Sequence, residues 1–533
     1  MFKKSFVLVL LLSLLISSAV QAQTFTFFSA AEPNDWEDSQ VGQWIQDEFG
    51  VTLEIEYIVG DINTKTGLMI ASGDFPDLIF ANETQDRFVD AESLIPLNEL
   101  IEEYGVNTKK LYGPIMDKIK KADGNIYFLP RSRANRDLMN PTAGFWIQRA
   151  VLAEFDWPVI ETVDQYFELI RKYADKYPMI NGQETVGIRL LTDGWRAFTI
   201  ENTPAVIMGS QNDGNVIVDQ ETYQAKTFVD EDFARDYYQK LNQMYLGGYL
   251  DPESFVANYD QYIAALSTGA VLGVAYDQTW QIGPANTTLS EAGLDERMFV
   301  CLPVKMTADI KDRYQDPGTL VVRDGIGISV NCKDPVAAFK FLDRLQSEEV
   351  QKMLRWGLVG QDYLVDQDGR MYRTKEMREN HQNVNYMYRI GVVGNESRNG
   401  FPTAPNWYKY ADGNSWDPTG QVEEIRASYT DWDKKVLAAY GKDTYPEMFD
   451  QPTISPYGYA WDISIPDGHP AIIANTKLRD LQSEYLAKLV LAETGEYEQV
   501  WLEYLKKVER IDLEAYENYL TQKIRERVEA WGQ

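Results

Sequence analysis

The chain has 533 residues, of which 44% are hydrophobic and 13% aromatic, and it carries a formal net charge of −30. This composition is sufficient for a large folded core and argues against disorder. The acidic balance argues against nucleic acid or an anionic membrane as a partner, because binding phosphates needs a basic face.

The first 22 residues have the pattern of a secretory signal peptide. Lys3 and Lys4 precede an apolar stretch over 6–16, and small residues lead to a cleavage site after Ala22. The apolar stretch is shorter than the about 20 residues that a membrane span needs. We therefore expect a secreted protein, periplasmic if the host has an outer membrane and extracellular otherwise. No cysteine stands at the cleavage site to carry a lipid, so we expect an untethered monomer.

Strand and helix patterns alternate from the cleavage site onward. The first five predicted elements are a strand at 24–28, a helix at 41–49, a strand at 51–57, a helix at 61–71 and a strand at 78–80. This β-α-β-α-β order predicts a parallel sheet covered by helices, with ligands at the carboxyl ends of its strands.

The later chain continues the alternation and then changes character. Further elements are predicted as a strand at 126–129, a helix at 163–173, strands at 186–191, 271–274 and 298–302, and a helix at 335–346. Residues 360–470 are rich in Gly, Pro, Asn, Trp and Tyr and are expected to be irregular. From residue 475 the chain is predicted to be helical.

Five short motifs in a shared order resemble a known family. They are SGDFPDL at 72–78, GNIYFLP at 124–130, LGGYLDPE at 246–253, STGAVL at 267–272 and WGLVGQDY at 356–363. Together they resemble the extracellular solute-binding proteins of ABC sugar importers, in particular the long subfamily with lipoprotein-type and alginate-oligosaccharide-binding members. The resemblance covers nearly the whole mature chain.

The resemblance implies a type II periplasmic-binding fold, in which two α/β lobes joined by crossing segments close around a ligand. It implies one lobe from residues 23–130 with about 300–350, and a second from 131–299 with about 351–533. The hinge is expected near 129–131 and 301–304. It further implies an oligosaccharide as ligand and a membrane permease as partner.

One expected feature of the alginate-binding relatives is missing. They carry an acidic calcium loop, whereas the corresponding stretch here offers only Asn181, Gln183 and Glu184 as oxygen ligands. Calcium favours six to eight oxygens with several carboxylates, so we expect no metal and no other cofactor.

A sugar site needs flat aromatic rings for the C–H face of a pyranose and planar hydrogen-bonding groups for its hydroxyls. Trp195 and Arg196 follow the strand predicted at 186–191, and Tyr276, Asp277 and Trp280 follow the strand at 271–274. Both segments therefore fall where ligands bind a parallel sheet. The resemblance adds that Trp280 matches a sugar-stacking tryptophan. The alternative is that these aromatics belong to the core.

Five more residues are candidates for the ligand site. Trp36 follows the first strand, and Trp407 and Trp461 lie in the irregular late region. Arg131 and Arg133 follow the strand at 126–129, and two guanidinium groups there would suit a carboxylated sugar such as a uronate. The alternative for the arginines is pairing with some of the 81 acidic residues.

The sequence leaves three points open. Cys301 and Cys332 either form a disulfide or are two buried thiols, because an exported protein permits both.

A glycoside hydrolase would need two suitably spaced carboxylates, which 81 acidic residues could supply by chance. However, no catalytic motif is present and the two histidines have no metal-ligand partner at helical spacing, so an enzyme is not expected. A peptide-binding receptor of similar architecture is the other alternative.

Overall fold

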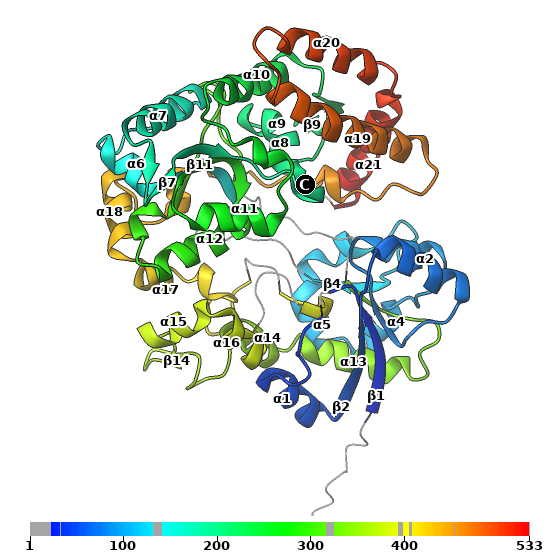
Figure 1. Ribbon diagram of the computed structural model, residues 1–533. Helices are drawn as coiled ribbons and strands as arrows, with labels where there is room; N and C mark the ends of the chain where they lie inside the picture. Colours follow the sequence, from blue (N-terminus) through cyan, green and yellow to red (C-terminus); the bar gives the residue numbers. More distant parts are fainter. Residues whose placement is uncertain are drawn as a thin grey trace, which may run out of the picture.

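The structure, a computed structural model, describes residues 23–31, 33–131, 141–315, 325–392, 398–404, 408–451 and 453–531. The predicted signal peptide lies outside these residues. The described chain forms two α/β lobes, of which lobe 1 is the lower and lobe 2 the upper body in Figure 1. This confirms the predicted two-lobed fold.

Lobe 1 is built on a five-stranded sheet in the order β2-β1-β3-β13-β4. Its strands are β1 (Gln23–Ser29), β2 (Val51–Tyr57), β3 (Leu78–Phe80), β4 (Phe128–Pro130) and β13 (Gly325–Ile328). Strand β1 pairs in parallel with β2 and β3, whereas β13 runs antiparallel to β3 and β4. The predicted β-α-β-α-β start of the chain is thus confirmed.

The first helix begins and ends at residues whose types favour helix termini. Ser39 caps the amino end of α1 (Gln40–Phe49) by accepting from the Gly42 N–H, and Gly50 ends it with a φ of 64°. Glycine adopts this left-handed conformation without the steric penalty of a side chain.

The remaining helices of lobe 1 are α2 (Ile62–Ser72), α3 (Gln85–Asp90), α4 (Asn98–Tyr104), α5 (Val106–Tyr112), α13 (Pro335–Leu345), α14 (Glu348–Trp356), α15 (Lys375–Gln382) and α16 (Val384–Ile390), with a small hairpin of β14 (Leu364–Val365) and β15 (Met371–Tyr372).

Lobe 2 is built on a four-stranded sheet in the order β12-β5-β11-β8. Its strands are β5 (Ala143–Gln148), β8 (Val186–Arg189), β11 (Val271–Gln278) and β12 (Phe299–Leu302). Strand β5 is antiparallel to both β11 and β12, while β11 and β8 are parallel. Three strands therefore end at one edge of the sheet, and β5 begins there.

Helices cover lobe 2 and extend it on one side. They are α6 (Arg149–Glu154), α7 (Val163–Lys176), α8 (Phe198–Glu201), α9 (Thr203–Ile207), α10 (Asp232–Leu246), α11 (Tyr259–Ser267), α12 (Thr279–Glu291), α17 (Val422–Ser428), α18 (Asp431–Tyr440), α19 (Pro470–Val490), α20 (Tyr497–Val508) and α21 (Leu513–Trp531), with the hairpins β6 (Met179–Ile180)/β7 (Gln183–Glu184) and β9 (Val216–Val218)/β10 (Ala225–Thr227). The helices α19 and α21 and the β9/β10 hairpin share a separate apolar core, which includes Val216, Ala471 and Leu520.

The lobe boundaries expected from the sequence are wrong in two places. Strand β12 pairs with β5, so the residues from about 300 that were expected in lobe 1 belong to lobe 2. Residues 351–416 were expected in lobe 2, but Met353, Trp356, Phe401 and Trp416 are buried in the core of lobe 1. The reason is that α14 buries an apolar face beside α13. The chain therefore returns to lobe 2 only between Trp416 and Ile425, which is buried in the lobe 2 core.

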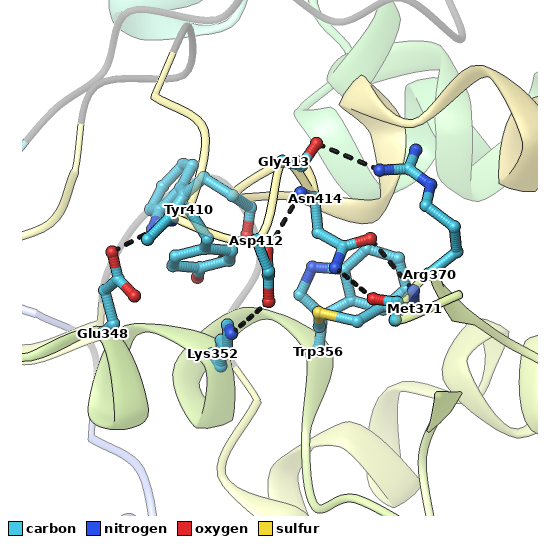
Figure 2. A network of polar contacts seen from close by, with 12 residues as sticks. Glu348, Lys352, Trp356, Arg370, Met371, Tyr410, Asp412, Gly413 and Asn414 are labelled. Atoms are coloured by element: carbon cyan, nitrogen blue, oxygen red, sulfur yellow. Dashed lines mark hydrogen bonds and ion pairs between the residues drawn. The ribbon is translucent and has the colours of Figure 1, made fainter. Parts of the chain in front are cut away.

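Figure 2 shows how polar contacts fasten residues 408–416 to lobe 1. Lys352 of α14 pairs with Asp412 at 2.6 Å. The buried Asn414 accepts from the Met371 N–H at 2.9 Å and donates to the Gly369 carbonyl at 2.8 Å. The Trp356 indole N–H donates to the carbonyl of Ser415 at 3.1 Å. These partners lie far apart in the sequence, so composition did not reveal which lobe the segment joins.

Two parts of the region expected to be irregular are helical, namely α15 with α16 and α17 with α18. The amino ends are capped by Thr374, Asn383 and Thr430. These helices have seven to ten residues. A stretch this short carries only a weak periodic signal amid aromatic and glycine-rich loops.

The two cysteines do not form a disulfide. Cys301 is buried in the core of lobe 2, whereas Cys332 packs against the core of lobe 1, and both are free. Their presence in different lobes is the physical reason, because a disulfide needs Cα atoms about 4.4–6.8 Å apart.

This assignment predicts the result of an alkylation experiment. We expect iodoacetamide to label both cysteines when the purified chain is unfolded without reductant, and mass spectrometry to find both modifications. Labelling that requires prior reduction would contradict the structure. A sample reduced first serves as the fully labelled control.

Candidate functional site

The carboxyl ends of the parallel strands in each lobe lie on the side where the chain crosses between the lobes. In lobe 1 these are the ends of β1, β2, β3 and β4, and the chain leaves for lobe 2 directly after β4. In lobe 2 they are the ends of β8, β11 and β12, and the chain returns to lobe 1 after β12. We call these two surfaces the interlobe edges. Open α/β sheets bind ligands at such edges.

Two exposed tryptophans stack on each other at the interlobe edge of lobe 2. Trp195 lies in the short 3₁₀ turn Gly194–Ala197 after β8, and Trp280 is the second residue of α12, directly after β11. Their ring centres are 5.8 Å apart and their planes differ by 21°. Trp195 is 55% exposed and Trp280 is 42% exposed. Rings of this size are usually covered, and an exposed flat pair presents a surface suited to the C–H face of a sugar.

Arg196 is held beside this pair by aromatic rings. Its guanidinium carbon lies 4.8 Å from the ring centre of Trp195 and 4.3 Å from that of Tyr259. Asp193 lies 3.9 Å from one of its nitrogens. A guanidinium between two rings loses little freedom when it forms further hydrogen bonds.

Tyr276 and Asp277 are buried near the carboxyl end of β11, which directly precedes Trp280. Tyr276 packs edge-on against Phe198 with ring centres 6.4 Å apart. Asp277 accepts from the Tyr262 hydroxyl at 2.6 Å, from the backbone N–H of Gln278 and from the Gln281 side chain. Burial raises the pKa of Asp277 to about 7, although these hydrogen bonds counter part of the effect.

The Asp277 network reaches the tryptophan platform through one side chain. Gln278, whose N–H donates to Asp277, accepts a hydrogen bond from the indole N–H of Trp280. Asp277 therefore orients the residue that holds Trp280, and the structure places it behind the exposed surface.

Trp461 joins lobe 2 from a distant part of the sequence. Its ring stacks on Tyr459 at 5.1 Å, and it lies beside Gly214. The buried Asp213 ties the two segments together, since it accepts from the Tyr457 hydroxyl and the Ala460 N–H, each at 2.8 Å. Burial raises the pKa of Asp213 to about 6.

The candidates of lobe 1 lie deeper than those of lobe 2. The Arg131 guanidinium lies 4.8 Å from the Phe80 ring centre and donates to Asn82 at 3.0 Å. Trp36 is 3% exposed and packs edge-on against Phe401, with ring centres 4.9 Å apart. Arg133 and Trp407 lie outside the described residues.

Sequence reasoning missed the polar residues at the interlobe edge of lobe 1. Asn34 follows β1, Tyr57 is the last residue of β2, and Asn82 follows β3. The rule that selected Trp195 and Trp280 could have found them, because each stands where a parallel strand ends. Asparagine is common in loops, and Tyr57 reads as one more residue of the strand, so residue type alone carried no signal.

The stretch compared with a calcium loop is a tight hairpin between β6 and β7. Asn181 and Gly182 form its turn with φ values of 51° and 80°. Positive φ at both positions is typical of the two-residue turns that join antiparallel strands. Among the residues that the structure describes, no three His, Cys, Asp or Glu side chains gather in a way that could hold a metal ion.

A family model for the bacterial extracellular solute-binding proteins matches residues 42–358. A fructooligosaccharide ABC transporter substrate-binding protein, FusA of Streptococcus pneumoniae, is 24% identical over 368 residues, which cover 64% of this chain and 64% of that protein. The match thus spans somewhat less than two thirds of this relative's length.

Solved structures share the fold over almost the whole chain. FusA in complex with kestose has a TM-score of 0.67 at 18% identity, covering 95% of this chain and 99% of the other. An HMO-binding solute-binding protein from Bifidobacterium longum infantis has a TM-score of 0.68 at 14% identity, with 94% and 98% covered. The alginate-binding protein AlgQ2 has a TM-score of 0.64 at 16% identity, with 95% and 98% covered.

In the part of the chain that the structure describes, no helix combines the length and the apolar character needed to cross a membrane.

Proposed function

The chain belongs to the bacterial extracellular solute-binding proteins, and from this premise we propose that it captures an oligosaccharide between its lobes and delivers it to an ABC importer. The observation that carries the proposal is the exposed Trp195–Trp280 pair at the interlobe edge of lobe 2. The similar proteins named above are described as binding fructooligosaccharide, HMO and alginate, which supports a carbohydrate over a peptide.

In this proposal the ligand stacks on Trp195 and Trp280 and forms hydrogen bonds with Arg196. Tyr276 and Asp277 act from behind the platform by holding its backbone and Gln278 in place. Trp36, Arg131, Arg133, Trp407 and Trp461 remain further candidates for the ligand surface. A uronate would favour contacts with Arg131 and Arg133, whereas a neutral sugar would not need them.

Capture proceeds by closure of the two lobes, because a ligand that contacts both lobes stabilises the shut form. The chain passes between the lobes after Arg131, after Tyr314 and between Trp416 and Ile425, so we propose bending at these three crossings. The hinge expected at 301–304 is wrong, because Val304 is buried in the core of lobe 2. Two contacts already join the lobes: Arg87 lies 3.6 Å from Asp467, and the Lys118 ammonium lies 5.6 Å from the Trp531 ring centre. The exposed surfaces of the closed lobes then present a complementary face to the permease.

The finer properties of the protein are proposed on the same basis. We propose an exported monomer that is not lipid-anchored, has no catalytic activity and no cofactor, and binds no nucleic acid. The acidic net charge of −30 supports the last point.

A thermal-shift screen followed by calorimetry tests the function. The panel contains kestose, nystose, maltotriose, xylotriose, trigalacturonate and a mixed tripeptide set. We expect at least one oligosaccharide to raise the melting temperature, because a ligand that binds only the folded state stabilises it. Stabilisation by peptides alone, or the release of shorter sugars during incubation, would overturn the proposal.

A further inference from the structure

A chain of three polar side chains ends in a hydrogen-bond donor without an acceptor. The Tyr57 hydroxyl donates to Asn34 Oδ1 at 3.2 Å, and Asn34 Nδ2 donates to Asn399 Oδ1 at 3.2 Å. Asn399 is fully buried, and its Nδ2 has no hydrogen-bond partner. The oxygen of Asn399 already accepts from Asn34, and the unpaired Nδ2 can only donate, so the open group is a hydrogen-bond donor.

These residues lie at the interlobe edge of lobe 1. Tyr57 ends β2 and Asn34 follows β1. Gly400, the neighbour of Asn399, packs on the ring of Phe80, the last residue of β3; a Cβ at Gly400 would come within 2.2 Å of that ring. The open donor is therefore anchored to the carboxyl ends of three parallel strands.

The backbone conformation explains why asparagine stands at this position. Asn399 has a φ of 65°, and asparagine tolerates the left-handed region better than most residues with a side chain. Gly400 continues in the same region with a φ of 71°. The two residues form a tight bend that fixes the amide against the strand ends.

A second open donor lies close by. The indole Nε1 of Trp36 is buried and has no hydrogen-bond partner. Its ring contacts Phe401, two residues after Asn399, and residues 34–36 line a small hollow together with 387–388 and 391–392. Buried N–H groups are nearly always hydrogen-bonded, so two unpaired donors on neighbouring segments of this edge point to acceptors supplied from outside the chain.

From this juxtaposition we propose that Asn399 is a hydrogen-bond donor of lobe 1 to the captured ligand, accepted by a hydroxyl or ring oxygen of the sugar. The inference rests on the proposed function, since it assumes an oligosaccharide between the lobes. It assigns lobe 1 a polar role that complements the aromatic surface of lobe 2. A ligand that stacks on Trp195 and Trp280 and also accepts from Asn399 contacts both lobes, and such a ligand stabilises the closed form.

Two substitutions of Asn399 test the proposal by calorimetry with the panel oligosaccharide that binds the wild type most tightly. Asn399→Gly keeps the left-handed backbone but removes the amide and the acceptor of Asn34, so we expect its Kd to rise about tenfold and its melting temperature to fall modestly while the protein stays folded. Asn399→Asp exchanges the donor for a carboxylate. We expect a similar loss at pH 7.5 and partial recovery at pH 4.5, where a protonated carboxyl can donate again.

Asn181→Gly is the matched control, because Asn181 also has a left-handed backbone but lies in the β6/β7 hairpin. Its affinity is expected to equal that of the wild type. Wild-type affinity in both Asn399 variants, together with lost binding in Trp280→Ala, would overturn this inference and leave the proposed function standing. A wild type that binds none of the sugars would overturn both.

Discussion

Replacing Trp280 by alanine is expected to weaken oligosaccharide binding by about thirtyfold or more. Trp280 is 42% exposed and stacks on Trp195, so truncation removes half of the flat surface proposed to contact the sugar. Truncating an aromatic at the centre of a binding surface typically costs about 2 kcal/mol or more. The fold should tolerate the change, because much of the side chain already faces solvent. Calorimetric titration with the tightest-binding oligosaccharide measures the effect.

Trp432→Ala provides the control for this prediction. Trp432 lies on α18, at the outer side of lobe 2 in Figure 1, with Lys435 over its ring at 4.5 Å. We expect this variant to bind sugar as the wild type does. If Trp280→Ala kept full affinity with an unchanged melting temperature, the tryptophan pair would not be the sugar platform.

Replacing Asp277 by asparagine is expected to stabilise the protein at neutral and alkaline pH. A folded pKa of about 7 against an ordinary value of 3.8 means that the folded protein holds this proton more tightly than the unfolded chain. Stability from this group is therefore fully present below pH 3.8 and is lost as the pH rises through 7. The loss corresponds to about 4 kcal/mol above pH 7. Asparagine keeps the shape and carries no charge.

The measurement is the free energy of unfolding of both proteins from pH 5 to pH 8.5. We expect the advantage of Asp277→Asn to grow with pH and to level off above pH 7. Burial also raises the pKa of Asp213 and of Glu201, so the pH dependence of the wild type contains contributions from all three residues. The difference between the two proteins contains only the contribution of Asp277. A difference that stays constant with pH would show that Asp277 does not titrate in this range.

Asparagine at position 277 should preserve the hydrogen bonds that orient the platform. Its oxygen can accept from Gln278 and Gln281, and its amide can donate to the Tyr262 oxygen. We therefore expect sugar affinity to remain close to that of the wild type. Higher stability with unchanged sugar affinity would show that the charge of Asp277 affects folding, whereas its hydrogen bonds position Gln278 and Trp280.

The residue patterns by themselves predicted an α/β fold with a parallel sheet, and the resemblance of the five motifs to a known family added its two lobes. The periodic patterns around β1, α1, β2 and β3 were local, and Gly50 stands where α1 ends. Trp195 and Trp280 were chosen because each stands within a few residues of the end of a strand that the pattern indicated. The ends of parallel strands meet at one edge, so sequence position alone was enough to bring these two residues together.

Only the tertiary structure decided which residues are exposed, which lobe the late segments join and which distant side chains meet. Tyr276 and Asp277 were expected to follow a strand ending at 274, but β11 continues to Gln278 and contains them, and the packing of Phe198 and Tyr262 buries them. Asn414 assigns the segment 408–416 to lobe 1 through partners near residue 370. Asn399 reaches Asn34 across 365 positions. Such contacts depend on complementary shape and donor geometry between segments, which no local pattern of residue types records.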